Sequence, residues 1–189
     1  MSHPERIVPD HEPPGVVAVH LKRYAFARPL CAGLVVLDAA CGVGYGSAFL
    51  AETAERVVGV DVDEETVAYA RQRYGSSRCS FEVMDVERLG FPDGSFGAAC
   101  SFETIEHVAD PERALAELHR VLLPGGTLVV STPHVAETTR SPANPFHRVE
   151  YSRGDLEALL RSRFAEVELF GQRRLQTQAH QLAQRLDVL

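Results

Sequence analysis

The sequence predicts an α/β fold built on a mostly parallel central sheet. Short apolar runs typical of strands alternate with longer stretches whose apolar residues follow a helical period. Alternating strands and helices form βαβ units, which make the strands parallel and cover both faces of the sheet. With 189 residues, 45% of them hydrophobic, the chain is long enough for a single domain, 1–189. The strand-like runs are Leu34–Leu37, Arg56–Val60, Cys79–Val83, Phe96–Cys100, Gly126–Ser131 and Ala165–Phe170.

Three stretches carry the signals of helices. Val16–Leu30 is amphipathic and precedes the first strand. Residues 63–75, DEETVAYARQRYG, begin with acids and end at Gly75, which is the polarity expected of a helix. Residues 110–126 open with Asp110 as an N-cap, continue with a proline in the first turn, and close on PGG. The last two stretches each connect consecutive strands, as crossover helices do.

Composition argues against several classes of protein. A net charge of −7 disfavours a broad basic surface for nucleic acid. The first residues lack the apolar segment of a signal peptide, and no window approaches the roughly 20 apolar residues of a membrane span. The four cysteines form no CxxC pair, which favours buried free thiols in a reducing cytoplasm. The histidines and acids show no compact metal-ligand spacing. We therefore expect a cytoplasmic protein with no metal, nucleic-acid or membrane partner; a divalent ion shared with a catechol-type substrate is the alternative left open.

The stretch LDAACGVGYGS, residues 37–47, places three glycines two residues apart, directly after the first strand. Glycines allow the backbone to turn sharply and to approach a ligand closely. The dinucleotide-binding fingerprint requires a further glycine at position 47, where this chain has Ser47. A tight strand-to-helix turn without any ligand would use the same glycines, so the motif needs support from other residues.

Three acids at strand ends give that support. Asp38 precedes Gly42 by four residues, and a carboxylate at this loop would repel a pyrophosphate but attract an ammonium group. Asp61 ends the second strand, where it can accept both hydroxyls of a ribose. Asp85 follows the third strand, where it can accept a hydrogen bond from an adenine amine. A ligand with a cationic amino-acid end, a ribose diol, an adenine and no phosphate is S-adenosylmethionine.

At these residues the chain closely resembles the class I, Rossmann-like S-adenosylmethionine-dependent methyltransferases, over residues 16–171. Four blocks in the family's order carry the resemblance: VLDAACGVGYGS, VVGVDVDEETVAYAR, VMDVERLGFPDGSF and SFETIEHVADPERALAELHRVLLPGGTLVVSTPH. The resemblance implies a three-layer sandwich, an S-adenosylmethionine cofactor and S-adenosylhomocysteine as product. The implied contacts are Asp38, Ala40, Gly42 and Gly44 at the methionine end, Asp61 and Val62 at the ribose and adenine, Asp85 and Val86 at the adenine edge, and Ser101 and Phe102 beside the sulfonium.

The acceptor side is less well defined. Residues 144–160, NPFHRVEYSRGDLEALL, and the ELFGQ that follows resemble a bacterial subgroup found with polysaccharide, glycosyl-transfer and natural-product pathways. This resemblance implies O-methylation of a small-molecule or carbohydrate acceptor, such as a sugar hydroxyl. Residues 136–151, rich in Pro, Asn and Thr, would form an acceptor-side lid. Tyr24 either closes over the cofactor from the first helix or packs in the core. The protein would act as a monomer or a homodimer.

Methyl transfer to a hydroxyl needs a group that takes up the hydroxyl's proton near the ends of the fourth and fifth strands. Histidine suits this role near neutral pH. His107 is the first candidate general base, and His147 is the second, as a base or as an acceptor-binding residue. Each has a structural alternative, a hydrogen bond to a loop carbonyl for His107 and, for His147, a turn fixed by the neighbouring Pro142 and Pro145. His134 is a weaker candidate that would more simply pack, and Glu106 would orient a neighbour.

The end of the chain departs from the family, whose sheet finishes with a seventh, antiparallel strand. After VELFGQ, the residues up to 189 show a helical stripe of apolar side chains, so we expect a C-terminal helix over 172–189 and no final strand. Either the chain is part of a longer protein, or the strand's place is open or filled by a partner. The alternative functions are an NAD-dependent dehydrogenase, which would need a pyrophosphate near Asp38, and a non-catalytic cofactor-binding or interaction module that uses the open sheet edge.

Overall fold

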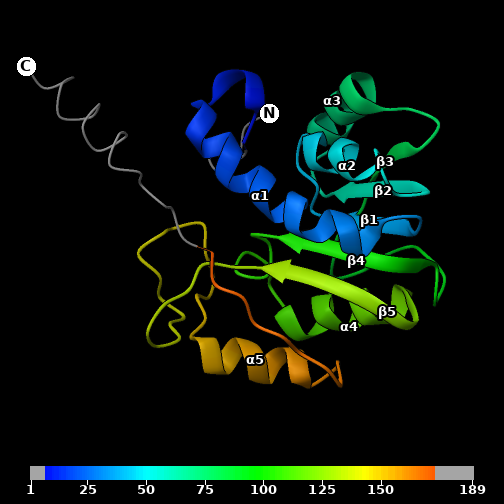
Figure 1. Cartoon of the computed structure of the whole chain (residues 1–189). Coiled ribbons are helices and arrows are strands. Elements are labelled where there is room, and N and C mark those ends of the chain that lie inside the picture. The colour runs from blue at the N-terminus through cyan, green and yellow to red at the C-terminus, as the bar shows by residue number, and fades with distance from the viewer. Residues whose placement is uncertain (1–6, 173–189) are drawn as a thin grey trace, which may run out of the picture.

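The computed structural model describes residues 7–172 of the chain. At its centre is a sheet of five strands in the order β3-β2-β1-β4-β5, in which every neighbouring pair is parallel (Figure 1). The order reverses between β1 and β4, the point at which the carboxyl ends of such strands form a ligand crevice. The predicted parallel α/β sheet is therefore confirmed. The strands are β1 Val35–Ala39, β2 Arg56–Asp61, β3 Cys79–Val83, β4 Phe96–Phe102 and β5 Leu122–Ser131.

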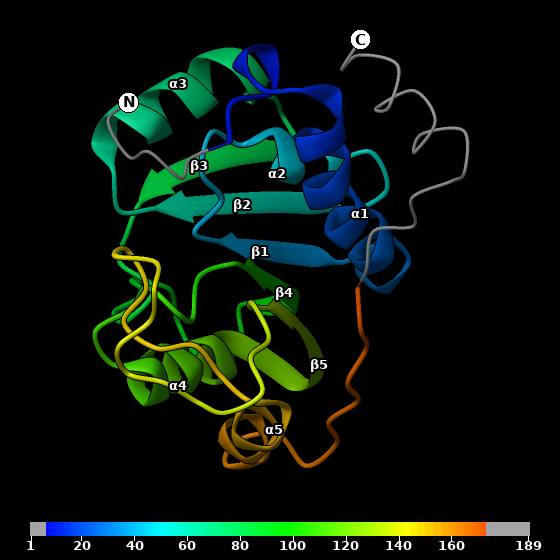
Figure 2. The same cartoon turned by 90° about the vertical axis from the view of Figure 1, so that its left-hand side faces the viewer.

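Helices cover both faces of this sheet, so the predicted three-layer sandwich is also confirmed (Figures 1 and 2). α1, α2 and α3 pack on one face, and α4 and α5 pack on the other. The three helices predicted from the sequence correspond to α1, α3 and α4. The helices are η1 Pro9–His11, a short 3-10 helix, α1 Pro14–Cys31, α2 Tyr45–Leu50, α3 Glu64–Tyr74, α4 Pro111–Val121 and α5 Arg153–Arg161.

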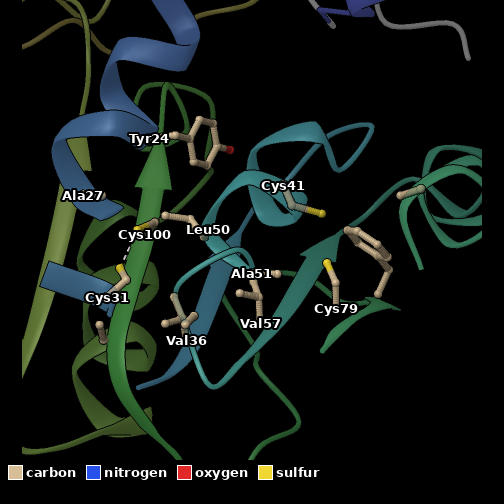
Figure 3. Packing of buried hydrophobic residues seen from close by; sticks show 14 of the residues in the cluster. Tyr24, Ala27, Cys31, Val36, Cys41, Leu50, Ala51, Val57, Cys79 and Cys100 are labelled. Atoms are coloured by element: carbon tan, nitrogen blue, oxygen red, sulfur yellow. Dashed lines mark hydrogen bonds between the residues drawn. The ribbon is translucent and has the colours of Figure 1, made fainter. Parts of the chain in front are cut away.

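The central strands are buried on both faces, as in other parallel sheets. Along β1, Val36 belongs to the cluster under α1, α2 and α3, whereas Leu37 belongs to the cluster under α4, because successive side chains of a strand point to opposite faces. Figure 3 shows the first cluster, in which Tyr24 and Ala27 project from α1 over the strands. All four cysteines are buried free thiols, as the sequence predicted.

Side-chain caps fix where two helices begin. The carboxylate of Asp110 accepts a hydrogen bond from the backbone N–H of Arg113 at 3.0 Å, so this residue caps α4 as predicted. The hydroxyl of Ser152 accepts from the backbone N–H of Asp155 at 3.2 Å and caps α5 in the same way. The cap of α4 matters for function because it ends the loop after β4, which carries candidate site residues.

The sixth predicted strand, Ala165–Phe170, does not form, and that prediction was wrong. These residues make no backbone–backbone hydrogen bond within the described chain. The segment leads instead to α1, where Phe170 packs on Phe26 with 5.0 Å between ring centroids and the Gln172 amide donates to the carbonyl of Val19 at 2.9 Å. A strand is stable only when a neighbouring strand satisfies its backbone groups. Alternating apolar residues were therefore not enough to form a strand here.

The outer edge of β5 has no strand beside it among residues 7–172. From residue 173 onward, the predicted C-terminal helix lies outside the described residues. None of the described helices combines the length and the apolar character that crossing a membrane would require.

Candidate functional site

A cavity of about 450 Å³ opens at the carboxyl ends of β1 to β4, where the strand order predicts a crevice. Most of the site residues predicted from the sequence line it, and they come from five separate segments of the chain. Four predicted residues, Asp38, Gly44, Ser101 and His147, lie outside its wall. The predicted residues that line it are Tyr24, Ala40, Gly42, Asp61, Val62, Asp85, Val86, Phe102 and His107.

The loop between β1 and α2 forms a concave wall of bare backbone. Gly42 has a φ of 55° and Gly44 a φ of 88°, both in the left-handed region that favours glycine. A Cβ at Gly42 would meet no atom within 4 Å, so the backbone itself faces the open cavity. A Cβ at Gly44 would lie 2.7 Å from the ring of Phe81, so packing behind the wall requires a glycine there. Ala40 also has a positive φ, of 59°, and lines the cavity.

Asp61, at the end of β2, is held in one orientation by the backbone. One carboxylate oxygen accepts from the N–H of Gly42 at 3.0 Å, and the other accepts from the N–H of Asp63 at 3.0 Å. The side chain is buried and lines the cavity. Each carboxylate oxygen has more than one lone pair, so a fixed carboxylate can accept further hydrogen bonds from a ligand's hydroxyls.

Beyond Asp61, the wall after β2 and β3 combines apolar side chains with two acids, Asp85 and Glu87. Val62 is 71% exposed and Val86 is buried, and both line the cavity. Asp85 follows β3, and its Oδ1 accepts from the backbone N–H of Glu87 at 2.9 Å. Apolar side chains with carboxylates beside them suit a planar ring that carries a hydrogen-bond donor.

Asp38 lies beneath the glycine loop rather than in the cavity wall. Its carboxylate accepts from the hydroxyl of Ser47 at 2.6 Å and from the hydroxyl of Tyr24 at 3.3 Å. Burial raises the pKa of Asp38 to about 7; the two hydrogen bonds oppose this rise, and the charge of Asp61 adds to it. A cation in the cavity would favour the ionised form of Asp38, so this residue can act on a ligand through its charge and through the loop that it supports.

Tyr24 of α1 is both a core residue and part of the cavity wall. Its side chain is buried and lies edge-to-face with Phe102, with 4.9 Å between ring centroids. A Cβ at Gly46 would lie 1.9 Å from the Tyr24 ring, so the third glycine of the loop makes room for this side chain. Figure 3 shows the ring extending from α1. Core packing of Tyr24 is therefore confirmed, whereas its closure over the cofactor stays a prediction.

The sequence analysis missed several residues of the wall. Arg23 and Glu103 line the cavity and form an ion pair at 3.1 Å, and the hydroxyl of Ser131 donates to Glu103 at 2.8 Å. The sequence placed Arg23 beside Tyr24, but only the packing of α1 near the end of β4 brings its side chain to Glu103. Further wall residues that were not predicted include His20, Tyr45, Met84, Thr104 and Arg148.

Two histidines and a glutamate meet beside the cavity. The ring centroids of His107 and His147 are 4.8 Å apart. Nδ1 of His107 lies 2.9 Å from the carbonyl oxygen of Phe146, and Nδ1 of His147 lies 2.7 Å from Oε1 of Glu150. Nε2 of His107 lies 4.0 Å from Oε1 of Glu106, whose side chain is fully buried. Burial raises the pKa of Glu106 to about 7.

The segment predicted as a lid, 136–151, brings His147 to this place. Its only regular pairing is through isolated bridges, and it contains no helix or strand. The backbone N–H of Arg148 donates to the carbonyl of Glu106 at 2.7 Å, which joins the segment to the loop after β4. Sequence spacing did not group His147 with Glu106 because this connection spans distant parts of the chain. His134, the weaker candidate, is exposed and does not line the cavity.

Comparison with known proteins agrees with this geometry. A family model described as a methyltransferase domain matches residues 37–130. A Mycolicibacterium smegmatis protein named probable S-adenosylmethionine-dependent methyltransferase is 41% identical over 141 residues, covering 73% of this chain and 54% of that protein. A Mycobacterium tuberculosis protein of the same description, Rv3030, is 36% identical over 180 residues, covering 88% of this chain and 62% of that protein. The crystal structure of the cyclase SpnF matches with a TM-score of 0.67 and 28% identity, covering 83% of this chain and 61% of that chain.

The chain thus spans between about half and about three fifths of the length of these proteins. The matched residues include the glycine loop and the ends of the four strands that surround the cavity. Residues 37–130 are therefore a domain of the class I S-adenosylmethionine-dependent methyltransferases, whose cofactor is S-adenosylmethionine.

Proposed function

We propose that the protein transfers a methyl group from S-adenosylmethionine to a hydroxyl of a small molecule or carbohydrate. When bound, S-adenosylmethionine supplies an electrophilic methyl group on a sulfonium and leaves as S-adenosylhomocysteine. The observation that carries the proposal is the cavity wall, in which Asp61 and Asp85 place carboxylates beside the bare backbone of the glycine loop. A dinucleotide would instead bring the negative charge of its pyrophosphate to this loop, above the carboxyl group of Asp38.

The residues present fit the cofactor. At Gly42 a Cβ would stand in open cavity space, so the missing side chain leaves room for the methionine end. The carboxylate of Asp61 is already oriented by two backbone N–H groups and would accept the ribose hydroxyls. Tyr24 would close over the ligand from α1. The other contacts that we propose are Ala40, Gly44 and Asp38 at the methionine end, Val62, Asp85 and Val86 at the adenine, and Ser101 and Phe102 near the sulfonium.

The acceptor side would supply the group that takes the hydroxyl's proton. A carbonyl oxygen can only accept a hydrogen bond, so Nδ1 of His107 carries a hydrogen and its Nε2 has the lone pair in the neutral ring. His147, oriented by Glu150, would be a second base or would bind the acceptor. The imidazole would take up the proton that the acceptor hydroxyl gives up as its oxygen receives the methyl group, and the cofactor's sulfur would keep the electron pair of the broken carbon–sulfur bond.

The setting of the reaction is part of the same proposal. We assign residues 136–151 to an acceptor-side lid, and the protein to a bacterial polysaccharide or natural-product pathway. Both relatives described above are bacterial. The buried free thiols suit a reducing compartment, which supports a cytoplasmic location. We expect a monomer or a homodimer, which size-exclusion chromatography with light scattering would resolve.

Binding of S-adenosylhomocysteine, measured by isothermal titration calorimetry, tests the proposal. Asp61→Ala should weaken binding at least about tenfold, because hydrogen bonds to a charged group contribute about 1.5–3 kcal/mol. Asp93→Ala is the matched control, because Asp93 is exposed and lies outside the cavity wall. Affinity that is unchanged in Asp61→Ala would refute the ribose assignment. A wild-type chain that binds no S-adenosylhomocysteine would refute the proposal as a whole.

A second candidate is a protein that uses the cofactor fold without methyl transfer. One comparison favours it, since the solved structure with a TM-score of 0.67 is named a cyclase. Mass spectrometry of a panel of hydroxylated acceptors, incubated with S-adenosylmethionine, separates the two candidates. A product heavier by one methyl group supports the transferase, whereas tight cofactor binding with no methylated product supports the second candidate.

A further inference from the structure

We propose that Glu106, His107 and His147 form a binding site for a divalent transition-metal cation on the acceptor side of the cavity. Each residue offers one ligand atom, and these three atoms all lie within 4.8 Å of one another. The set contains two imidazoles and one carboxylate, although the sequence spacing alone had indicated no metal site. Three further observations, on the carboxylate, on the ring nitrogens and on the space beside them, carry this inference.

The carboxylate of Glu106 is buried and has one oxygen that could bind a cation. Its side chain has no exposed surface, and its Oε2 accepts from the hydroxyl of Thr132 at 2.9 Å. Its Oε1 is also buried and has no hydrogen-bond partner among the described residues. Nε2 of His107 is 4.0 Å from this oxygen, which is too far for a hydrogen bond. Buried polar atoms are nearly always satisfied, so Oε1 needs a partner, and a cation shared with the histidines would provide one.

The two imidazoles are oriented as metal-binding histidines are. Such a histidine usually donates its other ring N–H to a carbonyl or a carboxylate, which fixes the tautomer. His107 has the carbonyl of Phe146 at its Nδ1, at 2.9 Å, and His147 has the carboxylate of Glu150 at its Nδ1, at 2.7 Å. Both partners accept, so in each neutral ring the lone pair is on Nε2. Nε2 of His147 is 2.9 Å from the side-chain amide of Asn144, which a cation would displace.

The ligand types and the spacing select the class of cation. Imidazole nitrogens favour zinc, cobalt, iron or nickel over magnesium and calcium, which prefer oxygen. Around a tetrahedral ion with bonds of about 2.1 Å, ligand atoms are about 3.4 Å apart. The three ligand atoms, now within 4.8 Å of one another, would therefore move closer by up to roughly 1.4 Å. Because His107 also lines the cavity, the fourth position of the ion would face the acceptor.

The catalytic consequence rests on the proposed function and deepens it. A cation would occupy the same Nε2 lone pairs that the histidines need as bases, so the two roles exclude each other. With the cation present, the acceptor hydroxyl would approach the fourth position and lose its proton to solvent, because a divalent cation lowers the pKa of a hydroxyl beside it. The oxygen would then bond to the methyl carbon while the carbon–sulfur bond breaks, as before. This arrangement favours hydroxyl acceptors, because their proton must be lost for the oxygen to accept the methyl group.

Metal titration of the full chain tests the site. The protein is treated with a chelator, dialysed and titrated with zinc chloride by calorimetry, and its visible spectrum is recorded with cobalt chloride. We expect one tight zinc ion per chain that His147→Ala and Glu106→Gln weaken at least about tenfold. Glu150→Gln removes only the orienting carboxylate and should weaken zinc binding by about tenfold. His119→Ala is the control, because His119 lies on α4 and packs on Phe164; this change should leave zinc binding unaltered.

Each outcome decides the matter. Zinc affinity that is equal in the wild type and in His147→Ala, or a cobalt spectrum without ligand-field bands, overturns the site and leaves the histidine base in place. His147 lies in the irregular segment, so His147→Ala remains informative if the buried Glu106→Gln does not fold, which urea denaturation reports. S-adenosylhomocysteine binding is measured on the same chelated protein. Its persistence without zinc separates failure of the metal site from failure of the proposed function.

Discussion

The two sides of the cavity are built differently. On the side where we propose that the cofactor binds, which we call the cofactor side, three of the features lie within a few residues of a strand end: the glycine loop follows β1, Asp61 ends β2 and Asp85 follows β3. On the acceptor side, His107 meets His147 only because an irregular segment returns to the loop after β4 and bonds to it. The cofactor-side residues are therefore positioned by the strands that they directly follow. The position of His147 instead depends on the hydrogen bond between segment 136–151 and the loop after β4.

The largest effect that we expect concerns the rigid cofactor side. Gly44→Ala places a Cβ 2.7 Å from the Phe81 ring at a φ of 88°, so it combines overpacking with backbone strain. We expect the free energy of unfolding to fall by about 3 kcal/mol. The comparison is Gly154→Ala in α5, where a Cβ meets no atom within 4 Å; this change should stabilise by about 0.5 kcal/mol.

Urea denaturation of both glycine variants gives these values. If Gly44→Ala were as stable as the wild type, the loop between β1 and α2 would have to shift easily to accommodate the Cβ. That result would contradict the view that the cofactor side is the more rigid of the two.

A smaller effect concerns the charge beneath the glycine loop. The pKa of Asp38 is raised to about 7, above its value in the unfolded chain, so the folded state binds the extra proton between about pH 4 and pH 7. Asp38 therefore contributes stability at low pH that is lost as the pH rises through 7. A ligand with an ammonium group favours the ionised carboxylate, so affinity for S-adenosylhomocysteine should rise severalfold from pH 6 to pH 8.

Asp38→Asn keeps an acceptor for Ser47 and Tyr24 but removes this titration. Calorimetry of wild type and variant at the two pH values separates Asp38 from the histidines His20 and His107, which also line the cavity. A pH dependence that survives in Asp38→Asn would exclude Asp38 as its source.

The smallest effect tests whether the two sides are independent. In the irregular segment, the side chain of Asn144 accepts from the N–H of Phe146 at 3.0 Å and contacts His147 at 2.9 Å. Asn144→Ala should loosen this turn and reduce methyl transfer, while affinity for S-adenosylhomocysteine stays within about twofold of the wild type, because Asn144 is outside the cavity wall. Calorimetry and product mass spectrometry on the same preparation measure both. A tenfold loss of cofactor affinity would show that the sides are coupled.

The same contrast explains what the sequence could predict. The parallel strands, the caps of α4 and the acids of the cofactor side follow from short patterns, and the structure places Asp61 and Asp85 together in the cavity wall. The pair Arg23 and Glu103 could not be predicted, because it depends on how α1 packs against β4. The strand predicted at Ala165–Phe170 failed for a related reason, since a strand is defined by its neighbour rather than by its own residues.

The position of Tyr24 has a thermodynamic consequence for α1. The ring occupies the room left by Gly46 and at the same time forms part of the cavity wall, so any ligand that touches it favours the docked state of the helix. Hydrogen exchange along residues 14–31 should therefore slow when the cavity is filled. The exchange rate of the first helix would then report whether the cavity is occupied.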